Sequence, residues 1–451
     1  MITLLAFVGA IALLVVFHEY GHYWVARRFG VKVLRFSLGF GKVIYRKRFA
    51  NSDTEWVISA IPLGGYVKML DEREGEVLPG ELDQAFNRKP VLQRMAIVAA
   101  GPLANFLLAI VLYWILFMHG VPGLKPVIGE VPQGTPAAMA QMQSGETILS
   151  INGEAVPSWQ ELRWTLLTQA LQQGEVIIEA QSSSGTTLSH SLSLSTLEAA
   201  DLDGEFLDKL GLHLNQPVLL PVIGKLSEGG VAKRAGLQEG DVVLRVNGLS
   251  VSSWSALVDL VRAHPGQTLS LDIKRGEILV SLAVIPQTVL ESGKTVGKIG
   301  AAPKVDQAAV DAMYVEVSYG PLEALTQSLK KTFDTSVISL KMLGKMVMGD
   351  VSMKNLSGPI TIADYAGQSA HMGLVAYLGF LALISISLGV LNLLPVPLLD
   401  GGHLLYYVAE LLKGSPVSEQ AWEIGQKIGI ALLGTLMVFA IYNDINRLIS
   451  G

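Results

Sequence analysis

Four long apolar stretches constrain the fold of this 451-residue chain more than any other feature of its sequence. They cover roughly residues 3 to 25, 95 to 118, 374 to 399 and 424 to 442. Each is close to the ~20 residues that a helix needs to cross a bilayer. Half of the residues are hydrophobic, only 16% are charged and the mean hydropathy is +0.43, a balance that is unusual for a soluble protein. We therefore predict an α-helical polytopic membrane protein with four transmembrane helices.

The remaining composition excludes several classes of function. The formal net charge of -5 is too small to indicate a nucleic-acid partner. The chain has no cysteine, which excludes a disulfide framework and a thiolate metal site. No basic segment precedes the first apolar stretch and no clear small-residue cleavage site follows it, so we expect an uncleaved span and not a removed signal peptide.

Basic residues predict the orientation of the chain in the membrane. Cytoplasmic loops carry an excess of lysine and arginine. Such residues gather after the first span and before the second: Arg27, Arg28, Lys32, Arg35, Lys42, Arg88, Lys89 and Arg94. We therefore predict that the loop 27–94 and the later loop 401–423 are cytoplasmic. The N-terminus, the section from about 119 to 373 and the C-terminus would lie outside.

The first span ends in a motif with metal-binding spacing, FHEYGHY at 17–23. His18 and His22 share one face of a helix, and the glutamate Glu19 lies beside them, as in the H-E-x-x-H pattern of zinc peptidases. Ionisable side chains within a membrane-spanning helix cost about 3 kcal/mol each on insertion scales, so they indicate a functional site. The alternatives are a polar cluster between helices or a proton relay. A catalytic Zn²⁺ takes a third protein ligand and leaves one position for water.

The third ligand is expected at the end of the third span, which runs in the same direction as the first. The chain there reads NLLPVPLLDGGH, from Asn392 to His403. Pro395 and Pro397 interrupt the helix, which is tolerated in a membrane where backbone lines a protected cavity. Asp400 is the favoured ligand and His403 ranks below it. The alternative is that Asp400 only ends the helix, before a Gly401-Gly402 turn.

The predicted cytoplasmic loop contains two β-like segments, residues 36–47 and 56–69. They are rich in β-branched and aromatic residues, and glycines interrupt them. We expect a sheet whose free edge can add an extended peptide strand, with a plain cytoplasmic hairpin as the alternative.

The section after the second span contains an internal repeat. Five pairs of residues lie 95 positions apart: Gly129 and Gly224, Gly145 and Gly240, Asn152 and Asn247, Gly153 and Gly248, Trp159 and Trp254. Each Asn-Gly predicts a tight hairpin turn. We predict two α/β domains, at 119–215 and 216–305, that resemble PDZ domains. They either bind extended peptides or act only as a steric filter.

Less specific expectations concern the other segments. Residues 321–350 have the pattern of an interfacial amphipathic helix. Residues 356–363 then form part of a linker within 306–373 that leads to the third span and is a candidate gate. Five histidines are expected in surface or turn positions: His119, His190, His213, His264 and His371.

The combination of HEYGH, AAGPLANF at 99–106 and LLDGG resembles the site-2 protease family of intramembrane zinc metalloproteases. The likeness extends over the whole chain. It implies that His18, His22 and Asp400 bind one zinc ion, that Glu19 activates water and that Asn392 helps to seat the substrate. The chain departs from the family pattern at Ser387, where a second asparagine is common.

The resemblance also implies a function, the second cut in regulated intramembrane proteolysis of single-pass membrane proteins. The implied substrates are a trimmed anti-sigma factor of the sigma-E envelope stress response and remnant signal peptides. Two other classes stay open. A membrane-anchored PDZ adaptor would not need the three residues His18, Glu19 and His22 or the distant Asp400. An ion or proton carrier would need paired charged residues in several spans.

Overall fold

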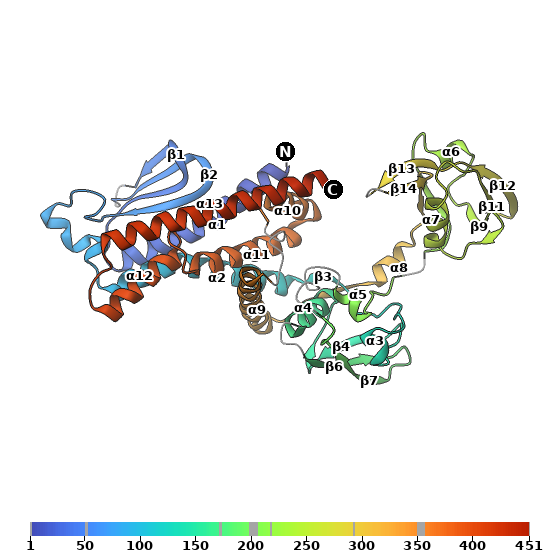
Figure 1. Cartoon of the computed structure of the whole chain (residues 1–451), viewed down its shortest axis with the longest axis horizontal. Coiled ribbons are helices and arrows are strands. Elements are labelled where there is room, and N and C mark those ends of the chain that lie inside the picture. Colours follow the sequence, from blue (N-terminus) through green and yellow to red (C-terminus); the bar gives the residue numbers. More distant parts are fainter. Residues whose placement is uncertain are drawn as a thin grey trace. The chain divides into compact units, whose positions relative to one another are not determined.

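The computed structural model describes residues 2–49, 53–170, 174–197, 206–216, 219–291, 294–349 and 357–450. The chain divides into two compact units (Figure 1). The first comprises residues 1–121, 197–205 and 316–450, and the second is formed mainly by residues 122–196 and 206–315. The N-terminal and C-terminal thirds of the sequence therefore fold together, and the section between them folds separately.

The four predicted spans are confirmed as helices in the first unit. Among the described residues, four helices are long and apolar enough to cross a membrane: α1 (Ile2–Arg28), α2 (Val91–His119), α11 (Leu374–Leu393) and α13 (Glu419–Ser450). Helix α13 begins five residues before the predicted start at 424, because Glu419 to Glu423 extend the helix beyond the apolar stretch.

Helices α1, α2 and α11 share one apolar core. Its buried members are small or aliphatic, which allows close packing between the helices: Ala10, Leu14, Leu108, Ala109, Leu112, Leu381, Ala382, Ile386 and Val390. Helix α13, by contrast, exposes most of its apolar side chains. This three-helix core joins segments from both ends of the chain.

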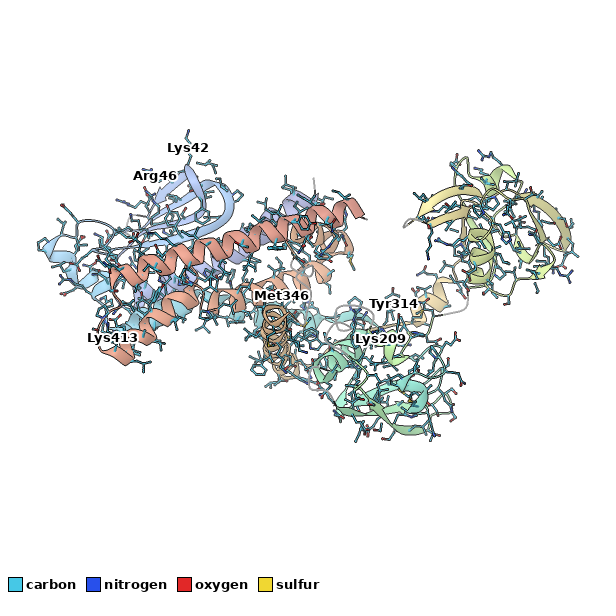
Figure 2. All side chains as sticks on the ribbon, viewed as in Figure 1. Lys42, Arg46, Lys209, Tyr314, Met346 and Lys413 are labelled. Carbon is cyan, nitrogen blue, oxygen red and sulfur yellow. The ribbon has the colours of Figure 1, made fainter. Side chains whose placement is uncertain are left out.

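The two β-like segments form the expected antiparallel pair, β1 (Val33–Arg48) and β2 (Glu55–Met69). Both strands bend sharply, so that Phe36 of β1 pairs with Trp56 on one side and Val67 on the other. Gly39 allows the bend because its φ is +91° and a Cβ there would lie 2.8 Å from the Ile61 carbonyl oxygen. The sheet packs against α1 (Figure 1), and Lys42 and Arg46 project away from it (Figure 2). Two short 3-10 helices follow, η1 (Pro79–Gln84) and η2 (Phe86–Arg88).

The alternative in which Asp400 only ends a helix before a Gly401-Gly402 turn is wrong. Asp400 is the first residue of a helix, α12 (Asp400–Lys413), and both glycines lie in its first turn. A Cβ at Gly401 would lie 2.2 Å from the Leu394 carbonyl oxygen, and one at Gly402 would lie 2.4 Å from that of Val396. The glycines are therefore needed for close approach to the preceding segment and not for a reversal of the chain.

The expected amphipathic helix is present as α9 (Pro321–Met348), which packs on α2 and α11. Part of the predicted linker is helical as well, because α10 (Pro359–Met372) precedes α11; Leu356, the first residue of the 356–363 stretch, lies outside the described residues. Asp444 of α13 caps α10, since its carboxylate accepts hydrogen bonds from the backbone N–H groups of Gly358, Ile360 and Thr361. This contact attaches α13 to a helix that packs on α1.

The second unit contains two four-stranded sheets of identical topology, β5-β4-β6-β7 and β10-β9-β11-β12. Its elements are β3 (Val121–Leu124), α3 (Pro136–Met139), β4 (Thr147–Ile151), β5 (Glu154–Ala155), α4 (Trp159–Ala170), β6 (Glu175–Gln181), β7 (Thr187–Ser193), α5 (Phe206–Leu210), β8 (Ile223–Leu226), α6 (Val231–Arg234), β9 (Val242–Val246), β10 (Leu249–Ser250), α7 (Trp254–Arg262), β11 (Leu269–Arg275), β12 (Ile278–Val284), β13 (Gln287–Glu291), β14 (Lys294–Lys298), β15 (Ala301–Pro303), α8 (Gln307–Ala312) and β16 (Tyr314–Val317).

The backbone repeats with the 95-residue offset found in the sequence. Asn152 and Asn247 both have a φ of +51°, and Gly153 and Gly248, with φ of +78° and +80°, complete the same tight turn in each copy. Positive φ at both central residues is the conformation that Asn-Gly favours in a two-residue hairpin. Trp159 and Trp254 each begin the helix that follows. The same turn is therefore present at both positions of the repeat.

The two copies differ in how they neutralise one buried acidic residue. Asp241 is 1% exposed and accepts two hydrogen bonds of 2.8 Å from the Arg275 guanidinium. In the first copy the corresponding residue, Glu146, lies 3.0 Å from Nε2 of His190. The prediction that His190 is a surface residue is wrong, because this pair buries it to 7% exposure.

The Asp241 pair predicts a pH-dependent stability. Hydrogen bonds from Arg275 lower the pKa of Asp241 despite its burial. An unfolded aspartate binds its proton near pH ~3.9, so the stabilisation is fully present above that pH and is lost as the pH falls through the lower pKa of the folded state. Asp241→Asn should remove about 1–3 kcal/mol at pH 7 and flatten this dependence.

Hydrogen exchange of β9 and β11 in the full chain, corrected for intrinsic exchange rates, measures this effect. Asp259→Asn, which removes an exposed acid on α7, is the matched control and should leave exchange unchanged. Equal acid sensitivity of the wild type and Asp241→Asn would contradict the prediction.

Candidate metal centre

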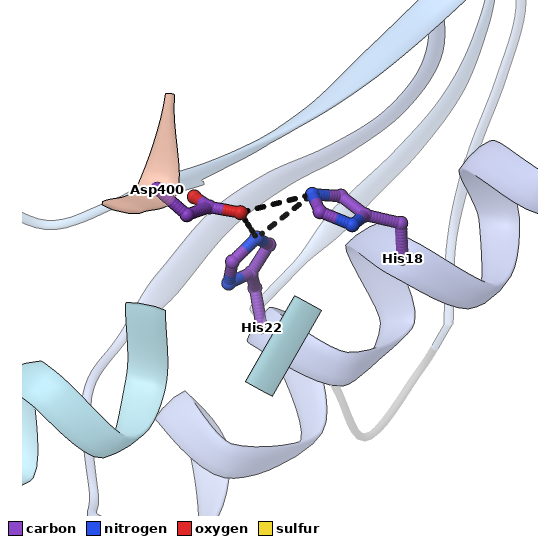
Figure 3. Close-up of side chains that lie close together, drawn as sticks. All are labelled: His18, His22 and Asp400. Carbon is purple, nitrogen blue, oxygen red and sulfur yellow. Dashed lines mark hydrogen bonds and ion pairs between the residues drawn. The ribbon is translucent and has the colours of Figure 1, made fainter. Parts of the chain in front are cut away.

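Three predicted ligands meet in the first unit. Nε2 of His18 and Nε2 of His22 lie 3.2 Å apart, and Oδ2 of Asp400 lies 3.3 Å from the first and 3.5 Å from the second (Figure 3). Within the described part of the chain, these are the residues that form a cluster able to hold a metal ion. Residues 382 positions apart in sequence therefore converge on one point.

The triangle of donor atoms fits a tetrahedral zinc site. Zn–N and Zn–O bonds of about 2.0–2.2 Å at tetrahedral angles separate ligand atoms by roughly 3.3–3.6 Å. The three measured separations are 3.2, 3.3 and 3.5 Å. Oδ2 of Asp400 is buried and accepts no hydrogen bond within the described residues, although a buried carboxylate oxygen normally has a partner. The donor set and its spacing thus match three protein ligands with one position left for water.

Helix α1 places Glu19 beside the cluster. The side chain is buried, and its carboxylate lies near the backbone N–H of Val67 in β2. Gly65 makes this contact possible, because a Cβ there would lie 2.8 Å from Val15 and 3.0 Å from the Cγ atom of Glu19. The sheet therefore orients the acid that lies between the two histidines.

Helix α2 supports the other side of α1. Nδ1 of His22 donates a hydrogen bond of 2.8 Å to the Ile97 carbonyl, which leaves Nε2 free to bind a metal. A Cβ at Gly21 would lie 2.3 Å from the Ala100 carbonyl oxygen, and a Cβ at Gly101 would lie 2.2 Å from Nε2 of His22. Both glycines are thus required for the close contact between the helices.

Helix α12 brings Asp400 to the cluster through a constrained turn. Leu398 has a φ of +85°, a conformation that costs a leucine about 1–3 kcal/mol and persists only where its surroundings impose it. The end of α12 is held by Glu410, which accepts hydrogen bonds of 2.8 and 3.2 Å from the Arg94 guanidinium of α2. Arg94 also lies over the Tyr407 ring, 4.9 Å from its centroid. The same helix α2 therefore supports His22 and the helix that carries Asp400.

The remaining candidate residues occupy different places. Asn392 lies half-buried near the end of α11. His403 lies on α12, one turn after Asp400, and is not part of the metal-binding group. The Ser387 hydroxyl donates to the Leu383 carbonyl within α11.

Sequence reasoning missed the groups that support the ligands. The Ile97 carbonyl and the Val67 N–H are backbone atoms, and no residue type marks them. Arg94 was recognised only as a basic residue of the loop, because nothing in the sequence shows that it faces Glu410, which lies 316 positions away.

The contact between α1 and α2 predicts the effect of a single methyl group. Gly21→Ala should displace His22 from the Ile97 carbonyl and weaken zinc binding about 10–100-fold, as loss of a supporting contact typically does. Gly9→Ala in the same helix is the matched control, because its Cβ would meet Tyr377 at an ordinary 3.6 Å. Zinc affinity measured by chelator competition tests this, and equal affinity of both variants would contradict it.

The Arg94–Glu410 pair predicts a strongly non-additive double variant. Arg94→Leu leaves a buried carboxylate without its partner and should cost about 3–5 kcal/mol, whereas the additional Glu410→Leu change should restore most of that loss. Thermal unfolding in detergent measures both effects.

Arg88→Leu is the control for this cycle, because the Arg88–Glu72 pair is partly exposed and should contribute less than about 1 kcal/mol. If the double variant loses as much stability as Arg94→Leu and Glu410→Leu lose together, the ion pair does not couple the helices.

Comparison with known proteins gives matches over nearly the whole chain. The profile of peptidase family M50 matches residues 6–436. The regulator of sigma-E protease RseP of Escherichia coli K12 is 43% identical over 445 residues, 99% of this chain and 98% of that protein. Protease RseP of Yersinia pestis is 44% identical over 447 residues, 99% of both chains. A relative from Neisseria meningitidis, 43% identical over 453 residues (99% of each chain), bears the provisional name zinc metalloprotease.

A solved PDZ domain of an SdrC-like protein from Listeria innocua covers 20% of this chain and 97% of that domain, with 22% identity and a TM-score of 0.16. The full-length matches agree with the metal-binding geometry and with the four apolar helices of a bacterial inner membrane protein. This chain belongs to peptidase family M50 and is a membrane-embedded metalloprotease.

Proposed function

We propose that this protein is an intramembrane zinc endopeptidase that makes the second cut in single-pass membrane proteins. The observation that carries the proposal is the triangle of donor atoms with sides of 3.2, 3.3 and 3.5 Å, formed by His18, His22 and Asp400. These residues would hold one Zn²⁺ per chain. Two imidazoles and a carboxylate suit Zn²⁺, and the provisional name of the Neisseria meningitidis relative supports this choice.

Amide hydrolysis requires an activated water molecule and a polarised carbonyl. Zn²⁺ bound at this site would supply both, by polarising the carbonyl and lowering the pKa of a bound water. Glu19 would accept the proton of the attacking water and transfer it to the leaving amine. The Val67 N–H orients its carboxylate for this role. Asn392, at the end of α11, would donate to the substrate backbone and help to hold it at the site.

A helical substrate must be unwound before its peptide bonds can react. Residues 65–69 of β2 pair with β1 along one edge, and the N–H of Val67 points from the other edge to Glu19. A substrate segment added along this second edge would lie extended beside the proposed base. This geometry favours substrate alignment over the alternative of a plain cytoplasmic hairpin.

The second unit would select the substrates. We propose that its two copies, within 119–215 and 216–305, are PDZ-like domains outside the membrane, and that the loops 27–94 and 401–423 are cytoplasmic. The second copy has a cavity of about 490 Å³ between α7 and residues 297–302, which favours peptide binding over a purely steric role. Its lining is mostly apolar, including Trp254, Leu257 and Ile299.

The relatives from Escherichia coli and Yersinia pestis suggest the physiological pathway. Both bear the name of RseP, and the first is described as a regulator of sigma-E protease. We propose that the natural substrate is an anti-sigma factor whose outer domain has already been removed, and that remnant signal peptides are further substrates.

Glu19→Gln tests the proposed chemistry, because glutamine keeps the shape of the side chain and removes the base. We expect the wild type in detergent to cleave a single-pass substrate that lacks its outer domain. Glu19→Gln should lose at least about 100-fold in rate, since a positioned general base contributes ~10²–10⁴-fold. Both proteins should bind one equivalent of Zn²⁺ in chelator competition.

The control is Glu228→Gln, which makes the same chemical change at a side chain that is 95% exposed in the second unit. Its rate should equal that of the wild type. Equal cleavage by Glu19→Gln would refute the assigned base. Absence of cleavage by the wild type, together with retained peptide binding by the second unit, would favour a PDZ adaptor.

A further inference from the structure

Asn105 is a buried amide of α2 to which the proposed chemistry assigns no role. Its side chain is completely buried, and Nδ2 lies 3.2 Å from Nδ1 of His18. Its Oδ1 atom is buried and has no hydrogen-bond partner among the described residues. A buried asparagine within a membrane helix is costly, so a defined partner is expected for it.

Asn105 belongs to one face of α2 that contacts both histidines. Ile97, Gly101 and Asn105 are four residues apart and therefore share a face of the helix. The Ile97 carbonyl accepts the hydrogen bond of His22. Gly101 leaves room for both imidazoles, because a Cβ there would lie 2.2 Å from His22 and 2.8 Å from His18. Asn105 is thus placed against His18 as the Ile97 carbonyl is placed against His22.

The tautomer of His18 determines what its partner must provide. An imidazole that binds a metal through Nε2 carries its proton on Nδ1 and donates it to an acceptor. For His22 this acceptor is the Ile97 carbonyl, at 2.8 Å. For His18 the group beside Nδ1 is the Asn105 amide. A rotation of this amide by a half-turn about the Cβ–Cγ bond of Asn105 brings the unpartnered Oδ1 into the place of Nδ2.

We propose that Asn105 is a positioning residue that selects the metal-binding tautomer of His18. With Oδ1 toward His18 the amide accepts the Nδ1 proton and leaves Nε2 free for zinc. With Nδ2 toward His18 it donates to Nδ1 and favours a proton on Nε2, which can then bond to Asp400. An amide serves both states, whereas a carboxylate serves only the first. This inference rests on the proposed zinc site.

Two isosteric variants test the proposal by chelator competition with Zn²⁺ on the full chain in detergent. Asn105→Leu keeps the branched outline of the side chain but removes the acceptor, and we expect zinc affinity to fall about 10–100-fold. Asn105→Asp keeps the shape and can only accept from Nδ1–H, so its affinity should be at least that of the wild type. A role in packing alone predicts the opposite order, because an apolar core tolerates leucine better than aspartate.

Ser385→Ala is the matched control. The Ser385 hydroxyl donates a hydrogen bond of 2.7 Å to the backbone carbonyl of Asn105, so this change removes a buried bond at the same residue without altering its amide. Its zinc affinity should equal that of the wild type.

The outcomes separate this inference from the proposed function. Wild-type affinity of Asn105→Leu, or an equal loss in Asn105→Asp, would overturn the role of Asn105 while leaving the zinc site intact. A wild type that binds no Zn²⁺ would overturn both. If Asn105→Leu fails to fold, retained affinity of Asn105→Asp supports the proposal and a loss of affinity overturns it.

Discussion

The close contact between α1 and α2 is the constraint on which the rest of the structure depends. Gly21 lies directly against the backbone of α2, and Gly101 lies against the imidazoles of α1. Only glycine allows this approach, because a single methyl group would overlap backbone or ring atoms at 2.2–2.3 Å. The contact brings the Ile97 carbonyl to His22 and the Asn105 amide to His18. Each histidine of the proposed metal site is thereby in contact with a polar group of α2.

Asp400, the third proposed ligand, is brought to the two histidines by a turn and not by a helix–helix contact. Two prolines end α11, and the chain then turns through the constrained backbone of Leu398 into α12. The glycines after Asp400 permit this helix to start against the segment that precedes it. At its other end, Glu410 attaches it to Arg94 of α2. Helix α2 therefore contacts both the histidines of α1 and the helix that carries Asp400, although these come from opposite ends of the sequence.

The second unit shows how one backbone can accommodate different chemistry. Both copies use the same Asn-Gly turn and the same strand order. Yet the buried acid of the second copy is neutralised by an arginine, Arg275, and that of the first is paired with a histidine, His190. Glycine and asparagine at the turns are required by the backbone, so they repeat at a constant offset. The partner of the buried acid only has to lie close to it, and it comes from β7 in the first copy and from β11 in the second.

The sequence by itself indicated the four spans, the duplicated section and the motifs that contain His18, His22 and Asp400, because apolar length, repeat offset and motif spacing can be read directly along the chain. It left a turn at Gly401 and Gly402 open as an alternative, since a glycine needed for close approach looks the same as one needed for chain reversal. Only the tertiary structure decided which backbone carbonyl, which amide and which ion pair support the site. These partners lie far apart along the chain, and no local pattern records such distances.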